Sequence, residues 1–199
     1  MALKIQYNKI ALQRFQKELK VRENALPTLQ AKEAALRVEV KKAKYEVDRV
    51  RKQLDELQHD ISATHRLWAE FPSGLAKVKD VMIDIKKIAG VKTPIFRHAE
   101  FEIEPFSLFA MPSWIPRGIE LLKQIVSLRI EEEVARKKVD ILEYARKKTT
   151  QKVNLYEKVQ IPAFNEAILK IKRFLEDEEN LAKSSQKILK NKIAAAEAA

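Results

Sequence analysis

The sequence of 199 residues predicts a mainly α-helical fold, a long antiparallel two-helix coiled coil with a small central cap containing a short helix and a β-hairpin. Three observations support this fold class. Apolar residues recur at helical spacing towards both ends of the chain, only three glycines occur, and the middle alternates between apolar and acidic residues. We expect an N-terminal helix over 1–70, the cap over 71–112 and a C-terminal helix over 113–199.

The clearest pattern lies between residues 36 and 61, where apolar residues follow one another at alternating steps of four and three. These steps average about 3.5 residues, the repeat of a coiled coil, whereas a strand needs a period of two. A helix with one apolar stripe requires a partner helix that covers it. The predicted seam positions are Leu36, Val40, Ala43, Val47, Val50, Leu54, Leu57 and Ile61.

The same register extends back towards residue 5, so we expect one helix from about residue 3 to residue 70. Three polar residues, Asn8, Arg22 and Glu33, interrupt the apolar series. Pro27 removes a backbone donor and crowds the preceding turn, which favours a kink.

The middle of the chain differs in kind. Residues 75–89 are expected to form the short amphipathic helix, closed by Gly90. Residues 91–104 are expected to form the hairpin, because Phe101 and Ile103 alternate with glutamates as in a half-buried strand.

The second long helix is expected over about 113–192, with Ile168, Ile171 and Leu175 on its seam. Its apolar phase drifts between residues 147 and 154. Antiparallel pairing would bring Pro27 close to the height of Pro162. One interpretation is a shared kink at these two prolines; the alternative is that each proline is tolerated separately.

Charge is unevenly distributed along a chain of net charge +11. Residues 1–52 hold 14 Lys and Arg against 6 Asp and Glu, and residues 136–173 hold 11 against 4. The simpler interpretation is the solvated surface of a coiled coil; the other is a surface for an acidic partner or a polyanion.

No pattern indicates catalysis, so we expect no catalytic, cofactor-binding or metal site. The chain has no phosphate-binding glycine motif and no cysteine, and its three histidines, His59, His65 and His98, lack the spacing of a zinc site. No apolar run approaches the ~18 residues of a membrane span, and the N-terminus lacks a signal-peptide core. These features favour a cytoplasmic protein.

Three segments in the right order carry a resemblance to a known family. Residues 8–29 hold regularly spaced leucines followed by LKVRENAL, and the central AGVKTPIF precedes an acidic–apolar strand. Residues 151–179 contain the dipeptides Val153-Asn154 and Ile161-Pro162 and end in an acidic run. Together they resemble the D subunit of the V-type (A/V-type) ATPases and ATP synthases, although Arg22, Glu23 and Asn24 depart from the usual pattern.

The resemblance implies the central-stalk rotor subunit, which transmits torque between a catalytic ring and the membrane rotor and is itself no enzyme. The implied partners are the catalytic and regulatory A and B ring subunits, the small F subunit of the central stalk and the socket subunit of the membrane rotor. The resemblance implies no nucleic-acid partner, no cofactor and no direct membrane insertion, with a location peripheral to the membrane. The alternative is a basic coiled-coil nucleic-acid-binding or scaffold protein. The candidate ring-facing residues are Lys4, Lys9, Arg14, Lys17, Lys170, Lys172 and Arg173.

Overall fold

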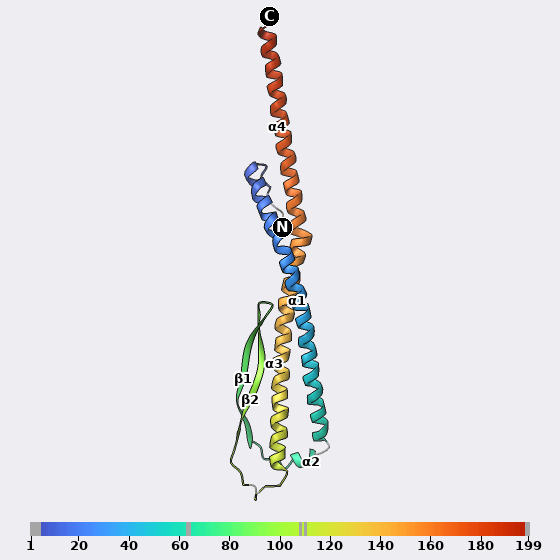
Figure 1. Cartoon of the computed structure of the whole chain (residues 1–199), viewed down its shortest axis with the longest axis vertical. Coiled ribbons are helices and arrows are strands. Elements are labelled where there is room, and N and C mark those ends of the chain that lie inside the picture. The colour runs from blue at the N-terminus through green and yellow to red at the C-terminus, as the bar shows by residue number, and fades with distance from the viewer. Residues whose placement is uncertain (1–4, 63–64, 108, 110, 198–199) are drawn as a thin grey trace. The chain divides into compact units, whose positions relative to one another are not determined.

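The computed structural model describes residues 5–62, 65–107, 109 and 111–197 (Figure 1). The fold is mainly helical with one antiparallel hairpin, which confirms the predicted class. The chain forms two compact units. The terminal unit comprises residues 1–31 and 149–199, and the central unit comprises residues 32–148.

Helix α1 (Lys9–Ser62) is shorter than the predicted helix over 3–70. Asn8 explains its start, because its side-chain Oδ1 accepts a 2.6 Å hydrogen bond from the Ala11 backbone N–H. This is an N-cap, which satisfies one of the free donors at a helix start. A separate short helix, α2 (His65–Trp68), follows α1.

The core of the terminal unit joins α1 to helix α4 (Ile161–Glu197). The Phe15 and Phe164 rings lie 5.7 Å apart, and the Tyr7 and Phe174 rings lie 5.0 Å apart. Partner numbers fall on α4 as they rise on α1, so the two helices run antiparallel. The buried members of this core are Ala11, Phe15, Phe164, Ala167, Ile168 and Ile171.

A π-helix, η1 (Leu155–Gln160), separates helix α3 (Ile115–Asn154) from α4. In this wider turn the Ile161 backbone N–H donates to the carbonyl oxygen of Tyr156. Pro162 has no N–H, and its ring would crowd the Lys158 carbonyl in a regular α-helix. The π turn inserts an extra residue and shifts later side chains around the helix, and it begins directly after residues 147–154, where the apolar phase drifts.

In the central unit, α1 packs against α3. Leu36, Val40, Ala43 and Leu142 form a buried cluster, and Ile88 and Val91 from the hairpin pack against it. Ion pairs cross between the same helices, from Lys44 to Glu143, from Lys138 to Glu46 and from Arg49 to Glu131.

The hairpin corrects two predictions. Residues 75–89 do not form a helix, because Ala76–Ile88 is strand β1, and residues 91–104 do not fold back on themselves, because Val91–Ile103 is a single strand, β2. The two strands pair antiparallel from Ile88 opposite Val91 to Ala76 opposite Ile103. The many β-branched residues of β1 favour a strand once a partner is present. Ala89 and Gly90 both have positive φ, as the two-residue turn of a tight hairpin requires.

Close packing surrounds the start of α3. The Trp114 ring lies 5.5 Å from Trp68 and 5.9 Å from Phe71. A Cβ on Gly118 would lie only 2.6 Å from a Trp114 ring carbon, so this ring covers the backbone of α3 where only glycine fits. The cluster joins α2 and the segment after it to α3 and includes the buried Leu75 and Ile115.

Candidate functional site

The predicted ring-facing residues lie on the terminal unit. Lys9, Arg14 and Lys17 on α1 are exposed, and so are Lys170, Lys172 and Arg173 on α4. Lys4 lies outside the described residues. The Tyr7 ring packs on Phe174 and the Phe15 ring on Phe164. The basic residues of α1 and those of α4 therefore lie along the same stretch of the antiparallel helix pair. We call these six described residues the basic surface.

The basic surface is weakly neutralised within its own unit. Lys170 is 3.9 Å from Glu166 in an exposed pair, and the Arg14 guanidinium lies 5.2 Å above the Phe15 ring. Lys183 and, to a lesser degree, Lys9 lower the pKa of Glu179. Exposed pairs of this kind contribute little to stability, so these cations remain available to an anionic partner.

Arg22, which interrupts the seam pattern, links α1 to η1. Its Nε donates a 2.7 Å hydrogen bond to the Gln160 side chain, and its guanidinium lies 4.5 Å above the Phe164 ring. The same side chain donates to the Glu18 carbonyl and pairs with its carboxylate. A charged residue at a seam position was the sequence signal for this contact. The sequence alone did not predict which residues Arg22 would contact.

The predicted seam residues occupy the interior of the two units to different extents. In the central unit five are buried and three, Val47, Leu57 and Ile61, are half-buried. In the terminal unit Ile168 and Ile171 are buried and Leu175 is half-buried. The five buried residues of the central unit are Leu36, Val40, Ala43, Val50 and Leu54.

The two candidate kink residues lie in different local settings. Pro27 lies inside α1 and is exposed, whereas Pro162 follows η1 directly. Arg22 contacts Gln160, and Pro27 is five residues further along α1. Antiparallel pairing therefore sets Pro27 opposite the beginning of η1, near residue 155, rather than opposite Pro162 itself.

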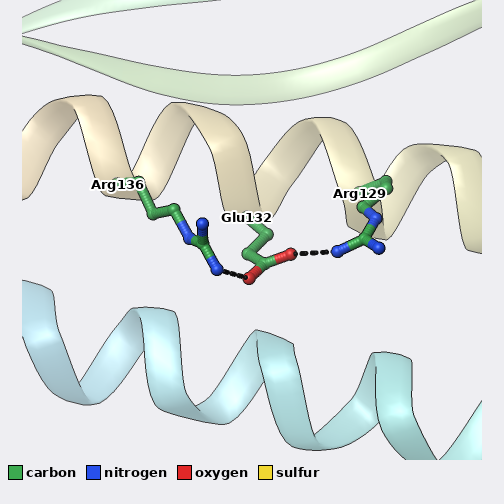
Figure 2. A network of polar contacts seen from close by, with 3 residues as sticks. All are labelled: Arg129, Glu132 and Arg136. Atoms are coloured by element: carbon green, nitrogen blue, oxygen red, sulfur yellow. Dashed lines mark hydrogen bonds and ion pairs between the residues drawn. The ribbon is translucent and has the colours of Figure 1, made fainter.

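A buried carboxylate on α3 escaped the sequence analysis. Glu132 is 3% exposed and accepts hydrogen bonds from Arg129 at 3.0 Å and Arg136 at 2.6 Å (Figure 2). Burial works to raise the Glu132 pKa, but the two guanidinium groups outweigh it and hold the pKa below its ordinary value. Of the three glutamates in the run Glu131–Glu133, only the middle one is buried. An arginine one turn to either side of the middle glutamate was the available signal.

The part of the chain that the structure describes holds neither a metal-ligand cluster nor a membrane-spanning helix. Within the described ranges, no three His, Asp or Glu side chains gather as a metal site would require. Nor does any helix in those ranges have the length and apolar character to cross a membrane.

Comparison with known proteins gives consistent matches over nearly the whole chain. The family model described as the D subunit of ATP synthase matches residues 11–191. A V-type ATP synthase D subunit from Borreliella burgdorferi is 35% identical over 194 residues, which cover 96% of this chain and 95% of the relative. The protein of that name from Chlamydia caviae is 30% identical over 176 residues, covering 86% of this chain and 85% of the relative.

The buried Glu132 predicts a pH-dependent stability. Because its pKa is lowered by folding, its contribution is complete above its ordinary pKa of 4.5 and is lost as the pH falls through the lower folded value. Glu132→Gln should cost about 1–3 kcal/mol near pH 7, since the charge and one of the two acceptor oxygens of a buried carboxylate are removed.

Denaturant unfolding of the full chain between pH 3 and pH 7 measures this effect. The difference between wild type and Glu132→Gln should shrink below about pH 4. Glu133→Gln is the matched control, because Glu133 is 68% exposed in its pair with Lys137. A difference that stays constant or grows towards acid pH would contradict the assignment.

Proposed function

The chain belongs to the family of ATP synthase D subunits, and on this premise we propose that it is the central-stalk rotor subunit of a V-type ATPase or ATP synthase. In this role it transmits torque between ATP hydrolysis or synthesis in a catalytic ring and ion translocation by the membrane rotor. The observation that carries the proposal is the family match over residues 11–191, on a chain whose long helices pair within both units.

The proposed role requires no catalytic residue on this chain. A rotor can drive ring subunits through different states only if it contacts those states differently, because a ligand shifts an equilibrium by its differential affinity. An asymmetric pair of helices offers such contacts, since α1 and α4 present different side chains around the terminal unit. The nucleotide chemistry then belongs to the ring.

The proposed partners follow from this role. They are the A and B ring subunits, the small F subunit of the central stalk and the socket subunit of the membrane rotor. The protein is then cytoplasmic and peripheral to the membrane, held by protein contacts. Paired helices suit a torque-bearing element because apolar contacts and ion pairs between α1 and α3 resist bending more than a single helix does.

Purification of the tagged chain from its native cells tests the proposal. We expect a nucleotide-hydrolysing ring and a small stalk protein to accompany it, with ATPase activity in the eluate. Recovery of RNA or DNA in a salt-sensitive complex, without an ATPase ring, would replace the proposal with the basic nucleic-acid-binding alternative, with which the net charge of +11 is compatible.

We further propose that the basic surface faces the ring. The triple reversal Lys9→Glu, Arg14→Glu and Lys17→Glu should weaken binding of the chain to the ring and lower coupled turnover, with Lys4→Glu adding to the effect. The loss should be largest at low ionic strength, because salt screens exposed charges.

The matched control reverses three exposed lysines of strand β1, Lys79, Lys86 and Lys87, which lie in the central unit. Ring affinity is measured by titration of the purified ring at two salt concentrations. Equal effects of the two triple variants, or no effect of the first, would rule out a specific role for the basic surface.

Finally, we propose that Pro27 and the η1–Pro162 segment form one shared kink in the terminal unit. Opposed irregularities in two packed helices should then couple energetically, whereas separately tolerated prolines should not. A double-mutant cycle with Pro27→Ala and Pro162→Ala, followed by denaturant unfolding, measures the coupling. Additive effects, within about 0.5 kcal/mol, would dispose of the shared kink.

A further inference from the structure

An open groove lies between strand β1 and helix α3 in the central unit. Its volume is about 600 Å³, and Val78, Ile125, Val126 and Ile130 form its apolar lining. The polar lining is Arg129, Glu132, Glu133 and Arg136, all from α3. The groove thus combines an apolar surface with the arginine pair that Glu132 holds.

Strand β1 is irregular beside this groove. Its pairing with β2 shifts between Val78 and Asp80, which marks a β-bulge. Bulges redirect side chains and are frequent at functional surfaces. Val78 lines the groove and is nevertheless 43% exposed, so the described chain leaves this apolar side chain partly uncovered.

Glu132 binds two cations, and Figure 2 shows the three side chains on the side of α3 that faces α1. All three residues also belong to the groove lining. Each guanidinium has five N–H donors, and each gives one hydrogen bond to the Glu132 carboxylate. The Arg129 and Arg136 side chains remain 59% and 57% exposed. Both side chains are therefore partly open to solvent while one hydrogen bond holds each guanidinium group to Glu132.

This arrangement is preorganised for carboxylates. Two guanidinium groups share one carboxylate, and arginine binds further carboxylates through paired, charge-assisted hydrogen bonds. A flexible arginine loses side-chain entropy when it binds, and Glu132 reduces that loss because it restricts both side chains beforehand. Glu133, which also lines the groove, is paired with Lys137.

The chemistry of the occupant follows from both halves of the groove. A nucleic acid would satisfy the arginines but leave the apolar lining uncovered. A helix fits both halves, because its backbone hydrogen bonds are already made and it can present apolar and acidic side chains on one face. The lining of α3 runs from Ile125 to Arg136, about three turns, which matches a helix lying alongside.

We propose that this groove is the docking site for an acidic amphipathic helix of another subunit in the same complex. Arg129 and Arg136 anchor carboxylates of that helix, and Glu132 is the positioning residue that holds both anchors. The inference rests on the proposed function, because the partner is taken from the assembled rotary complex.

A photo-crosslinker at position 133 in the assembled complex tests the groove directly. Glu133 lines the groove and is exposed, so this replacement leaves the buried core intact. We expect a crosslinked peptide that is helical, amphipathic and acidic. The control position is Glu120, an exposed residue of α3 outside the groove lining, in an ion pair with Arg117.

Charge variants test the assigned roles. Arg129→Glu together with Arg136→Glu should lower the crosslink yield about tenfold, and reversal of the acidic residues in the identified peptide should restore it. Arg129→Lys should retain only part of the crosslink yield, because lysine keeps the positive charge but lacks the planar guanidinium that binds a carboxylate through two hydrogen bonds. Glu132→Gln should weaken docking at neutral pH even where circular dichroism shows a folded chain, whereas Arg117→Gln should have no effect.

The outcomes separate the two proposals. If the complex assembles around this chain but position 133 gives no crosslink, or captures a strand or a peptide without acidic residues, the groove proposal fails and the rotor proposal stands. If the chain enters no ATPase complex, the proposed function itself fails. Unchanged yield in the double arginine variant would also overturn the groove assignment.

Discussion

The packing of both units depends on covering the apolar stripe of a long helix. In the terminal unit, Phe15 on α1 meets Phe164 on α4. In the central unit, Leu36 on α1 and Leu142 on α3 are fully buried in one cluster. A helix with one apolar face has little stability alone in water, so these contacts decide where each element lies. The hairpin then adds a further layer through Ile88 and Val91.

Three polar residues in or directly before the long helices each have a particular partner. Asn8 caps α1, Arg22 joins α1 to the π-helix, and Glu132 fixes two arginines on α3. Buried or half-buried polar groups are costly unless they are hydrogen-bonded, so such positions mark places where geometry overrides the repeat. Here they mark a helix start, a change of helix type and the wall of a groove.

This arrangement fits a protein that acts through its surfaces. A rotor needs contacts that differ around its axis and survive load, and it needs no concave reaction site. In the proposed rotor, the basic surface of the terminal unit and the groove of the central unit would bind partners through different interactions. The basic surface consists of exposed charges, whose interactions are screened by salt. The groove combines an apolar lining with cations held in place by a buried carboxylate.

The sequence by itself determined the fold class and the two long helices, because a repeat of three and four residues is specific to paired helices and its signal accumulates over many turns. The family followed from something else, the resemblance of three segments in the right order along the chain. The sequence also located Pro27 and Pro162 as irregular points. Only the tertiary structure decided that residues 76–88 are a strand, since short apolar segments take their conformation from their pairing partner, here β2. It also decided the π turn at η1 and the burial of Glu132, because both depend on what packs against α3 and α4 and leave no periodic trace in the chain.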